Sequence, residues 1–149
     1  MSRFNGLLST TYHPPRKWKL DLELKYDTDI LTEEERKGLQ EIGVPVTDDG
    51  IITVAAGFET DLASVPRAGW AFIAPFDVAR AAVVHDLLYK AIRDARAADM
   101  KINVRKLKKA SDKVFLDAMK LTEPKIATWK IWACYSAVRM FGYSSVKPR

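Results

Sequence analysis

The chain has 149 residues, 48% of them hydrophobic, which is enough for one folded domain with a substantial core and argues against a disordered protein. The single cysteine, Cys134, excludes an internal disulfide and argues against a structural zinc site. Residues 1–15 lack the long apolar core of a signal peptide, and no apolar run predicts a membrane-spanning helix, so we expect a cytoplasmic protein.

The formal net charge of +5 is unevenly distributed along the chain. Residues 1–100 carry 12 Lys and Arg against 16 Asp and Glu, a net charge of −4. Residues 101–149 carry 12 against 3, a net charge of +9. A basic C-terminal third could contact phosphates or an acidic protein surface, or it could be a solvated helix face.

The N-terminal part predicts strands around one short helix. Residues 17–27 alternate apolar and charged side chains, which predicts a half-buried antiparallel strand, and a second strand is expected over 51–55. Between them, Thr32 and Glu35 form the sequence pattern of a capping box, and Gly43 is placed to end the helix that begins there.

The rest of the chain predicts three helices, over residues 76–92, 104–121 and 124–142, with a polar connector over 93–103. The predicted class is therefore α+β: a small N-terminal antiparallel sheet followed by a packed three-helix unit in one domain, 1–149. Its expected parts are an N-terminal arm (1–16), a strand-rich part (17–66), a helical part (76–142) and a tail (143–149).

The last helix is apolar around much of its circumference. A three-residue spacing predicts a packed stripe of Trp129, Trp132, Tyr135, Val138 and Phe141. Because Ile131, Cys134 and Met140 lie outside that stripe, the helix is either central in the bundle or offers a second face to a partner. Cys134 itself is expected to be a buried small hydrophobe.

Polar residues stand among the most hydrophobic segments, in "GFETDLASVPR", "AAVVHDLLYK" and "SDKVFLDAMK". An ionised carboxylate near a core is costly unless it is paired or hydrogen-bonded, so these side chains are expected to form one polar cluster. Its predicted members are Thr60, Asp61, Ser64, Arg67, His85, Asp86, Tyr89 and Asp112.

Two interpretations of this cluster remain open. In the first, Asp61, His85, Asp86 and Asp112 hold a divalent metal (Mg, Mn or Zn) that ionises water, or His85 acts as a general base for the nucleophile Ser64, oriented by Asp61 or Asp112. In the second, the polar groups satisfy one another and fix a buried loop over the core.

The three quoted segments resemble a phage-associated family known as domain of unknown function 1353. The matching residues run from Phe58 to Pro66 and from His85 to Tyr89, with Asp112, Phe115 and Met119 in the third motif, and the resemblance extends over about residues 18–142. It implies a bacteriophage or prophage origin and brings no established activity.

Three functions follow as hypotheses. The first is a virion-associated or virion-assembly protein that binds other phage proteins, made in the host cytoplasm and carried in the virion if it is structural. The second is a small metal-assisted hydrolase. The third, nucleic-acid binding through residues 101–113, has weaker support because that basic segment lacks interleaved aromatic side chains.

Overall fold

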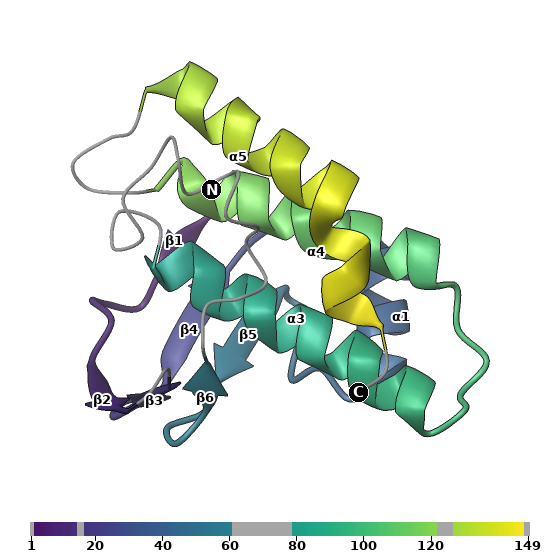
Figure 1. The fold of residues 1–149 in the computed structure, drawn as a ribbon, viewed down its shortest axis with the longest axis horizontal. Helices are drawn as coiled ribbons and strands as arrows, with labels where there is room; N and C mark the ends of the chain where they lie inside the picture. Colours follow the sequence, from purple (N-terminus) through teal and green to yellow (C-terminus); the bar gives the residue numbers. More distant parts are fainter. Residues whose placement is uncertain (1, 15–16, 61–78, 122–126, 148–149) are drawn as a thin grey trace.

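The computed structural model describes residues 2–14, 17–60, 79–121 and 127–147. Over these ranges, two small antiparallel sheets precede three long helices, which confirms the predicted α+β class (Figure 1). The predicted residues Asp61, Ser64, Arg67 and Pro124 lie outside the described residues.

Each sheet combines strands from distant parts of the N-terminal half, and every pairing is antiparallel. The segment 1–16, expected as an arm, contributes one strand to each sheet. One sheet has the order β1 (Arg3–Phe4), β4 (Leu24–Asp27) and β5 (Ile51–Val54), and the other has the order β2 (Thr10–His13), β3 (Lys17–Leu20) and β6 (Glu59–Thr60).

The prediction of one continuous strand over 17–27 is wrong, because β3 and β4 belong to different sheets. A bend at Asp21 separates them: its backbone N–H donates to the Ser9 carbonyl, and its carboxylate accepts from the Thr11 hydroxyl at 2.6 Å. Leu22 is 66% exposed beside this bend. The alternation of apolar residues continues through the bend, so periodicity alone could not reveal it.

The short helix α1 (Glu33–Glu41) begins as its capping box predicts. The Thr32 hydroxyl accepts from the Glu35 N–H at 3.1 Å, and the Glu35 carboxylate accepts from the Thr32 N–H at 2.9 Å. Gly43 follows the helix with φ +93°, the left-handed conformation that glycine tolerates best. Both predicted ends of this helix are confirmed.

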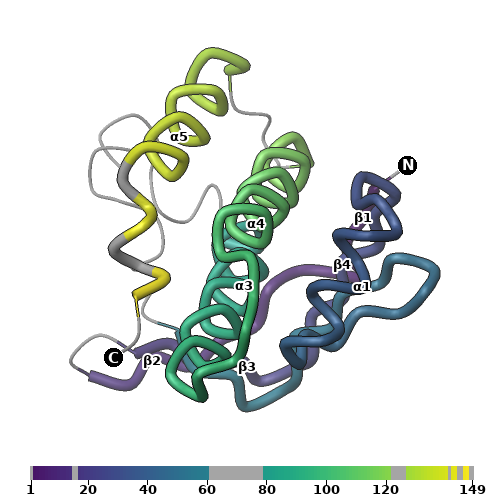
Figure 2. Tube along the Cα trace, turned by 90° about the vertical axis from the view of Figure 1, so that its right-hand side faces the viewer, coloured from purple at the N-terminus to yellow at the C-terminus, as the bar shows by residue number. Residues whose placement is uncertain are grey.

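The three long helices run in alternating directions across the view of Figure 1: α3 (Ala79–Ala97), α4 (Val104–Met119) and α5 (Thr128–Phe141). The first extends five residues past its predicted end at Ile92, because the buried stripe continues to Ala95. Figure 2 shows α1 and α5 on opposite sides of α4. Within the described ranges, no helix has the length and apolar character needed to span a membrane.

Buried side chains from strands and helices form one hydrophobic core. Two polar groups of β4 and its end also reach the helices: the Tyr26 hydroxyl and the Thr28 hydroxyl both donate to Asp117 of α4, the latter at 3.1 Å. The segment expected as a tail forms a 3-10 helix, η2 (Gly142–Val146), whose Val146 is fully buried. Arg96 of α3 holds it by donating to the Val146 carbonyl at 2.9 Å.

Candidate functional site

Two pairs of polar side chains face each other between α3 and α4. His85 and Tyr89 lie one turn apart on α3, and Lys108 and Asp112 lie one turn apart on α4, so each pair shares a helix face. Because the helices run antiparallel, successive turns of one meet successive turns of the other. None of the four residues has exposed surface.

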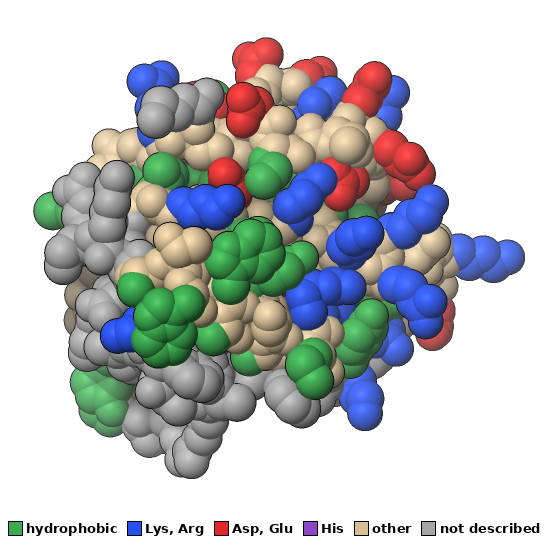
Figure 3. All heavy atoms as spheres, turned by 90° about the horizontal axis from the view of Figure 1, so that it is seen from above, with side chains coloured by type: hydrophobic (Ala, Val, Ile, Leu, Met, Phe, Trp, Pro, Cys, Tyr) green, Lys and Arg blue, Asp and Glu red, His purple; other side chains and the backbone are tan. Residues whose placement is uncertain are grey.

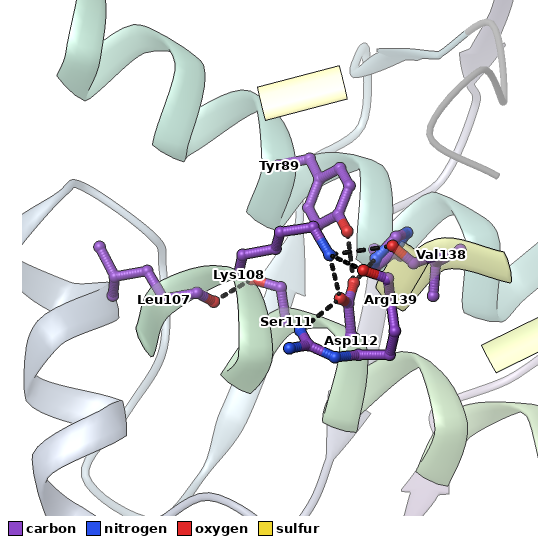
Figure 4. A network of polar contacts seen from close by, with 8 residues as sticks. Tyr89, Leu107, Lys108, Ser111, Asp112, Val138 and Arg139 are labelled. Atoms are coloured by element: carbon purple, nitrogen blue, oxygen red, sulfur yellow. Dashed lines mark hydrogen bonds and ion pairs between the residues drawn. The ribbon is translucent and has the colours of Figure 1, made fainter. Parts of the chain in front are cut away.

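Asp112 is the centre of this group (Figure 4). Its Oδ1 accepts from His85 Nε2 at 2.7 Å and from the Tyr89 hydroxyl. Its Oδ2 accepts from Lys108 Nζ at 2.8 Å and from an Arg139 guanidinium nitrogen at 2.9 Å. Asp112 was predicted to be partly buried and paired with His85, Arg67 or the Thr60–Ser64 loop; it is fully buried, and the pairing with His85 is confirmed. Two donors on each oxygen use the carboxylate's full accepting capacity.

Lys108 is a fully buried cation whose three protons all find acceptors. Besides Asp112, its Nζ donates to the Val138 carbonyl at 2.9 Å and to the Arg139 carbonyl at 3.3 Å (Figure 4). These carbonyls lie in the last turn of α5, where the helix dipole favours a positive charge, and the Val138 carbonyl also accepts from the Gly142 N–H. Lys108 therefore links Asp112 to the end of α5.

The electrostatic balance favours the ionised form of Asp112. Burial alone would raise its pKa, but the hydrogen bond and charge of His85, with the bonds from Lys108 and Tyr89, outweigh burial and hold the pKa below its usual value. Burial, followed by the nearby Asp112 charge, raises the pKa of Tyr89. The hydroxyl therefore stays protonated and donates.

His85 is held by its Nε2 and by aromatic contacts. Its ring stacks on Phe115 at 4.6 Å between centroids and lies 4.0 Å from the Tyr89 ring. Since Asp112 is ionised, the proton of their contact lies on Nε2. The other ring nitrogen, Nδ1, is buried and has no hydrogen-bond partner among the residues that the structure describes.

Comparison with family models gives one match, over residues 39–138, to the family described as Protein of unknown function (DUF1353). The chain belongs to this family. No curated protein and no solved structure matches. The match contains His85, Tyr89, Lys108 and Asp112, so most of the polar group lies in the family region of the chain, while Arg139 follows directly after it.

The remaining predicted members of the cluster separate into two sets. Thr60, at the end of β6, and Asp86, on α3, are buried at 3% and 5% exposure. Asp61, Ser64 and Arg67 lie outside the described residues, so the predicted catalytic and metal sets stay predictions. Within the described ranges, no group of three or more His, Cys, Asp or Glu side chains is arranged to hold a metal ion.

Sequence reasoning missed Lys108 and Arg139. Lysine is almost never fully buried, so Lys108 was counted with the basic surface. One signal could have found it: Lys108 lies four residues before Asp112, on the same helix face as a carboxylate that needed a partner. Arg139 had no such signal, because only the packing of α5 brings it to Asp112.

The outer face of α5 differs from the predicted packed stripe. The prediction is wrong for Trp129 and Trp132, which are 60% and 47% exposed, and right for Val138, which is buried, and Tyr135, which packs against the core. Ile131 and Cys134 complete the buried side of the helix. Because both faces of α5 are apolar, spacing could not identify the inner one. The expectation that Cys134 is buried is confirmed, and burial raises the pKa of its thiol to about 12.

Proposed function

We propose that this chain is a bacteriophage-encoded virion-associated or virion-assembly protein that acts by binding another protein. One observation carries the proposal: α5 presents a line of exposed side chains, Trp129, Trp132, Ser136 and Met140, at helical spacing on its outer face. Met140 is 70% exposed. Exposed apolar groups gathered on one helix face mark interaction sites, and tryptophan often dominates the binding energy of an interface.

The buried polar group supports a structural role for the residues around Asp112. Its carboxylate is inaccessible and fully used by protein donors, an arrangement that holds α5 in place through Arg139 and Lys108. The outer face of α5 is thereby kept in a fixed position relative to α3 and α4. A rigid helix presenting aromatic anchors suits binding, because little conformational freedom is lost on association.

The phage assignment rests on the resemblance of the two motifs around Asp61 and His85 to the phage-associated family. With this assignment we propose that the protein is made in the host cytoplasm during phage production, and that it is carried in the virion if it is structural.

The test is mass spectrometry of purified particles from a phage that encodes this chain, together with particle yield after Trp132→Ala. We expect the protein in the particles, or a loss of yield in the variant. The matched control is Leu22→Ala, which removes a leucine that is 66% exposed at the β3–β4 bend. Particles that lack the protein, with normal yield from Trp132→Ala, would contradict the proposal.

The second candidate function is a metal-assisted hydrolase using Asp61, His85, Asp86 and Asp112, and it is favoured by the buried Nδ1 of His85, which has no partner among the described residues. Calorimetric titration of the full chain with Mn²⁺ and Zn²⁺ tests it. Binding that disappears in both His85→Gln and Asp61→Asn would support this function, and the absence of any binding would remove its metal-dependent form.

A further inference from the structure

We infer that the outer face of α5 binds an acidic, partly apolar segment of a partner protein. This face, called the aromatic face below, consists of Trp129, Trp132, Ala133, Ser136 and Met140. The inference rests on the proposed function in taking a protein as the partner, and it adds the chemistry of that partner. The spacing of these residues places them along one side of the helix over about 16 Å, at 1.5 Å per residue.

Positive charge lies directly beside the aromatic rings. Lys130 Nζ is 5.7 Å from the centroid of the Trp129 ring, and Lys120 Nζ, at the end of α4, is 5.9 Å from that of Trp132. Figure 3, seen from the side on which α5 lies, shows exposed hydrophobic side chains with Lys and Arg next to them, and acidic side chains mainly toward one edge of the view. A carboxylate docking here would meet a lysine and an aromatic surface together.

The stretch of sequence that contains α5 is basic, although Arg139 is paired with Asp112 of α4. The segment of α5, "TWKIWACYSAVRMF", contains no Asp or Glu. Residues 118–149 contain six Lys and Arg and one Glu, a net charge of +5. The partner surface that complements the aromatic face is therefore negative as well as apolar, because opposite potentials speed association and disfavour basic competitors.

The same charges argue against other occupants. Two copies of the aromatic face would bring Lys120 and Lys130 of each chain together, and like charges at an interface are costly. Single-stranded nucleic acid is bound in a basic groove with stacking platforms, whereas α5 is a convex helix. An anionic membrane would require the apolar groups to extend beyond the lysines, yet both lysine heads lie near the ring faces.

The experiment is fluorescence anisotropy of labelled peptides with the purified full chain. The probe is a peptide of about twelve residues composed of Glu, Leu and Phe, long enough to follow the face as a helix. The first matched probe replaces Glu with Lys, and the second replaces Leu and Phe with Ser. The aromatic variant is Trp132→Ala, and its control at a distant exposed position is Leu22→Ala. The charge variant combines Lys120→Glu with Lys130→Glu, and its control is Lys101→Glu.

We expect the acidic amphipathic peptide to bind and both matched probes to bind at least about tenfold more weakly, the scale of losing one interface anchor. The aromatic and charge variants should weaken binding by a similar factor, and the controls should leave it unchanged. Binding should also weaken as salt is raised, since screening reduces attraction between exposed charges.

The inference is overturned if the acidic peptide does not bind, if the lysine peptide binds equally well, or if Trp132→Ala has no effect. Tighter Trp132-dependent binding to phosphatidylserine vesicles or to oligo(dT) would overturn it in favour of a membrane or a nucleic acid. The particle experiment is independent: the protein can be found in virions while the peptide fails, or the peptide can bind while the protein is absent from particles.

Discussion

Replacing Asp112 with Asn tests the central contact of the helical part. The variant keeps nearly the same shape but removes the negative charge. The new amide nitrogen is a donor, so on whichever side it lies it loses two of the four hydrogen bonds that the carboxylate accepts. Lys108, with no exposed surface, and Arg139 then remain as cations without their anion.

The magnitude follows from the burial of the group. Removing one partner of a buried ion pair costs about 3–5 kcal/mol, because an uncompensated charge stays in the interior. A change of about 1 kcal/mol lowers the midpoint of thermal unfolding by about 2–4 °C in a chain of this size. We therefore expect Asp112→Asn to lower the midpoint by about 6–20 °C.

The measurement is thermal and urea unfolding followed by circular dichroism. The matched control is Asp94→Asn on α3, whose carboxylate pairs with Lys90 at 2.6 Å while both side chains are at least half exposed. Exposed helix pairs contribute about 0.3–0.5 kcal/mol, so the control should change little. A loss of under about 1 kcal/mol in Asp112→Asn would refute the argument that this carboxylate holds buried charges together.

Two further predictions concern the pH dependence of stability and the substitution of a closely packed glycine. The pKa of Asp112 is lower in the folded chain than its unfolded value of about 3.9, so the stability that its charge contributes is present above that pH and is lost as the pH falls through the folded pKa. In urea titrations, the difference in unfolding free energy between wild type and Asp112→Asn should therefore shrink below about pH 4. A difference that stays constant with pH would count against the lowered pKa. Gly142→Ala should lower the free energy of unfolding by about 1–3 kcal/mol in thermal unfolding, because an added Cβ would lie 2.6 Å from the Tyr89 hydroxyl oxygen. The control Gly6→Ala, whose added Cβ would have no atom within 4 Å, should be neutral. Equal unfolding midpoints for the two variants would contradict the crowding at Gly142.

The elements predicted most accurately depend on local chemistry. Thr32 and Glu35 fix the start of α1 because the two residues bond each other, so no distant contact is needed. The division of residues 17–27 between two sheets, in contrast, depends on contacts between residues far apart in the sequence. It depends on Ser9, just before β2, and Thr11, within β2, bonding to Asp21, and sequence periodicity contains no information about such pairing.

Only part of the polar group around Asp112 could be predicted from the sequence. His85, Tyr89 and Asp112 drew attention because titratable groups stood among apolar neighbours. Lys108 and Arg139 are long side chains whose default position is solvent, and their burial depends on where the end of α5 packs. The cost of a buried carboxylate predicts that donors exist, but only the fold identifies them.

The family match covers residues 39–138, yet contacts to α4 come from beyond both of its ends. Tyr26 and Thr28, before residue 39, bind Asp117, and Arg139, after residue 138, binds Asp112. Trimming the chain to the matched segment would leave each of these carboxylates without donors that it has in the full chain. The limits of the family match are therefore not suitable limits for an expressed fragment.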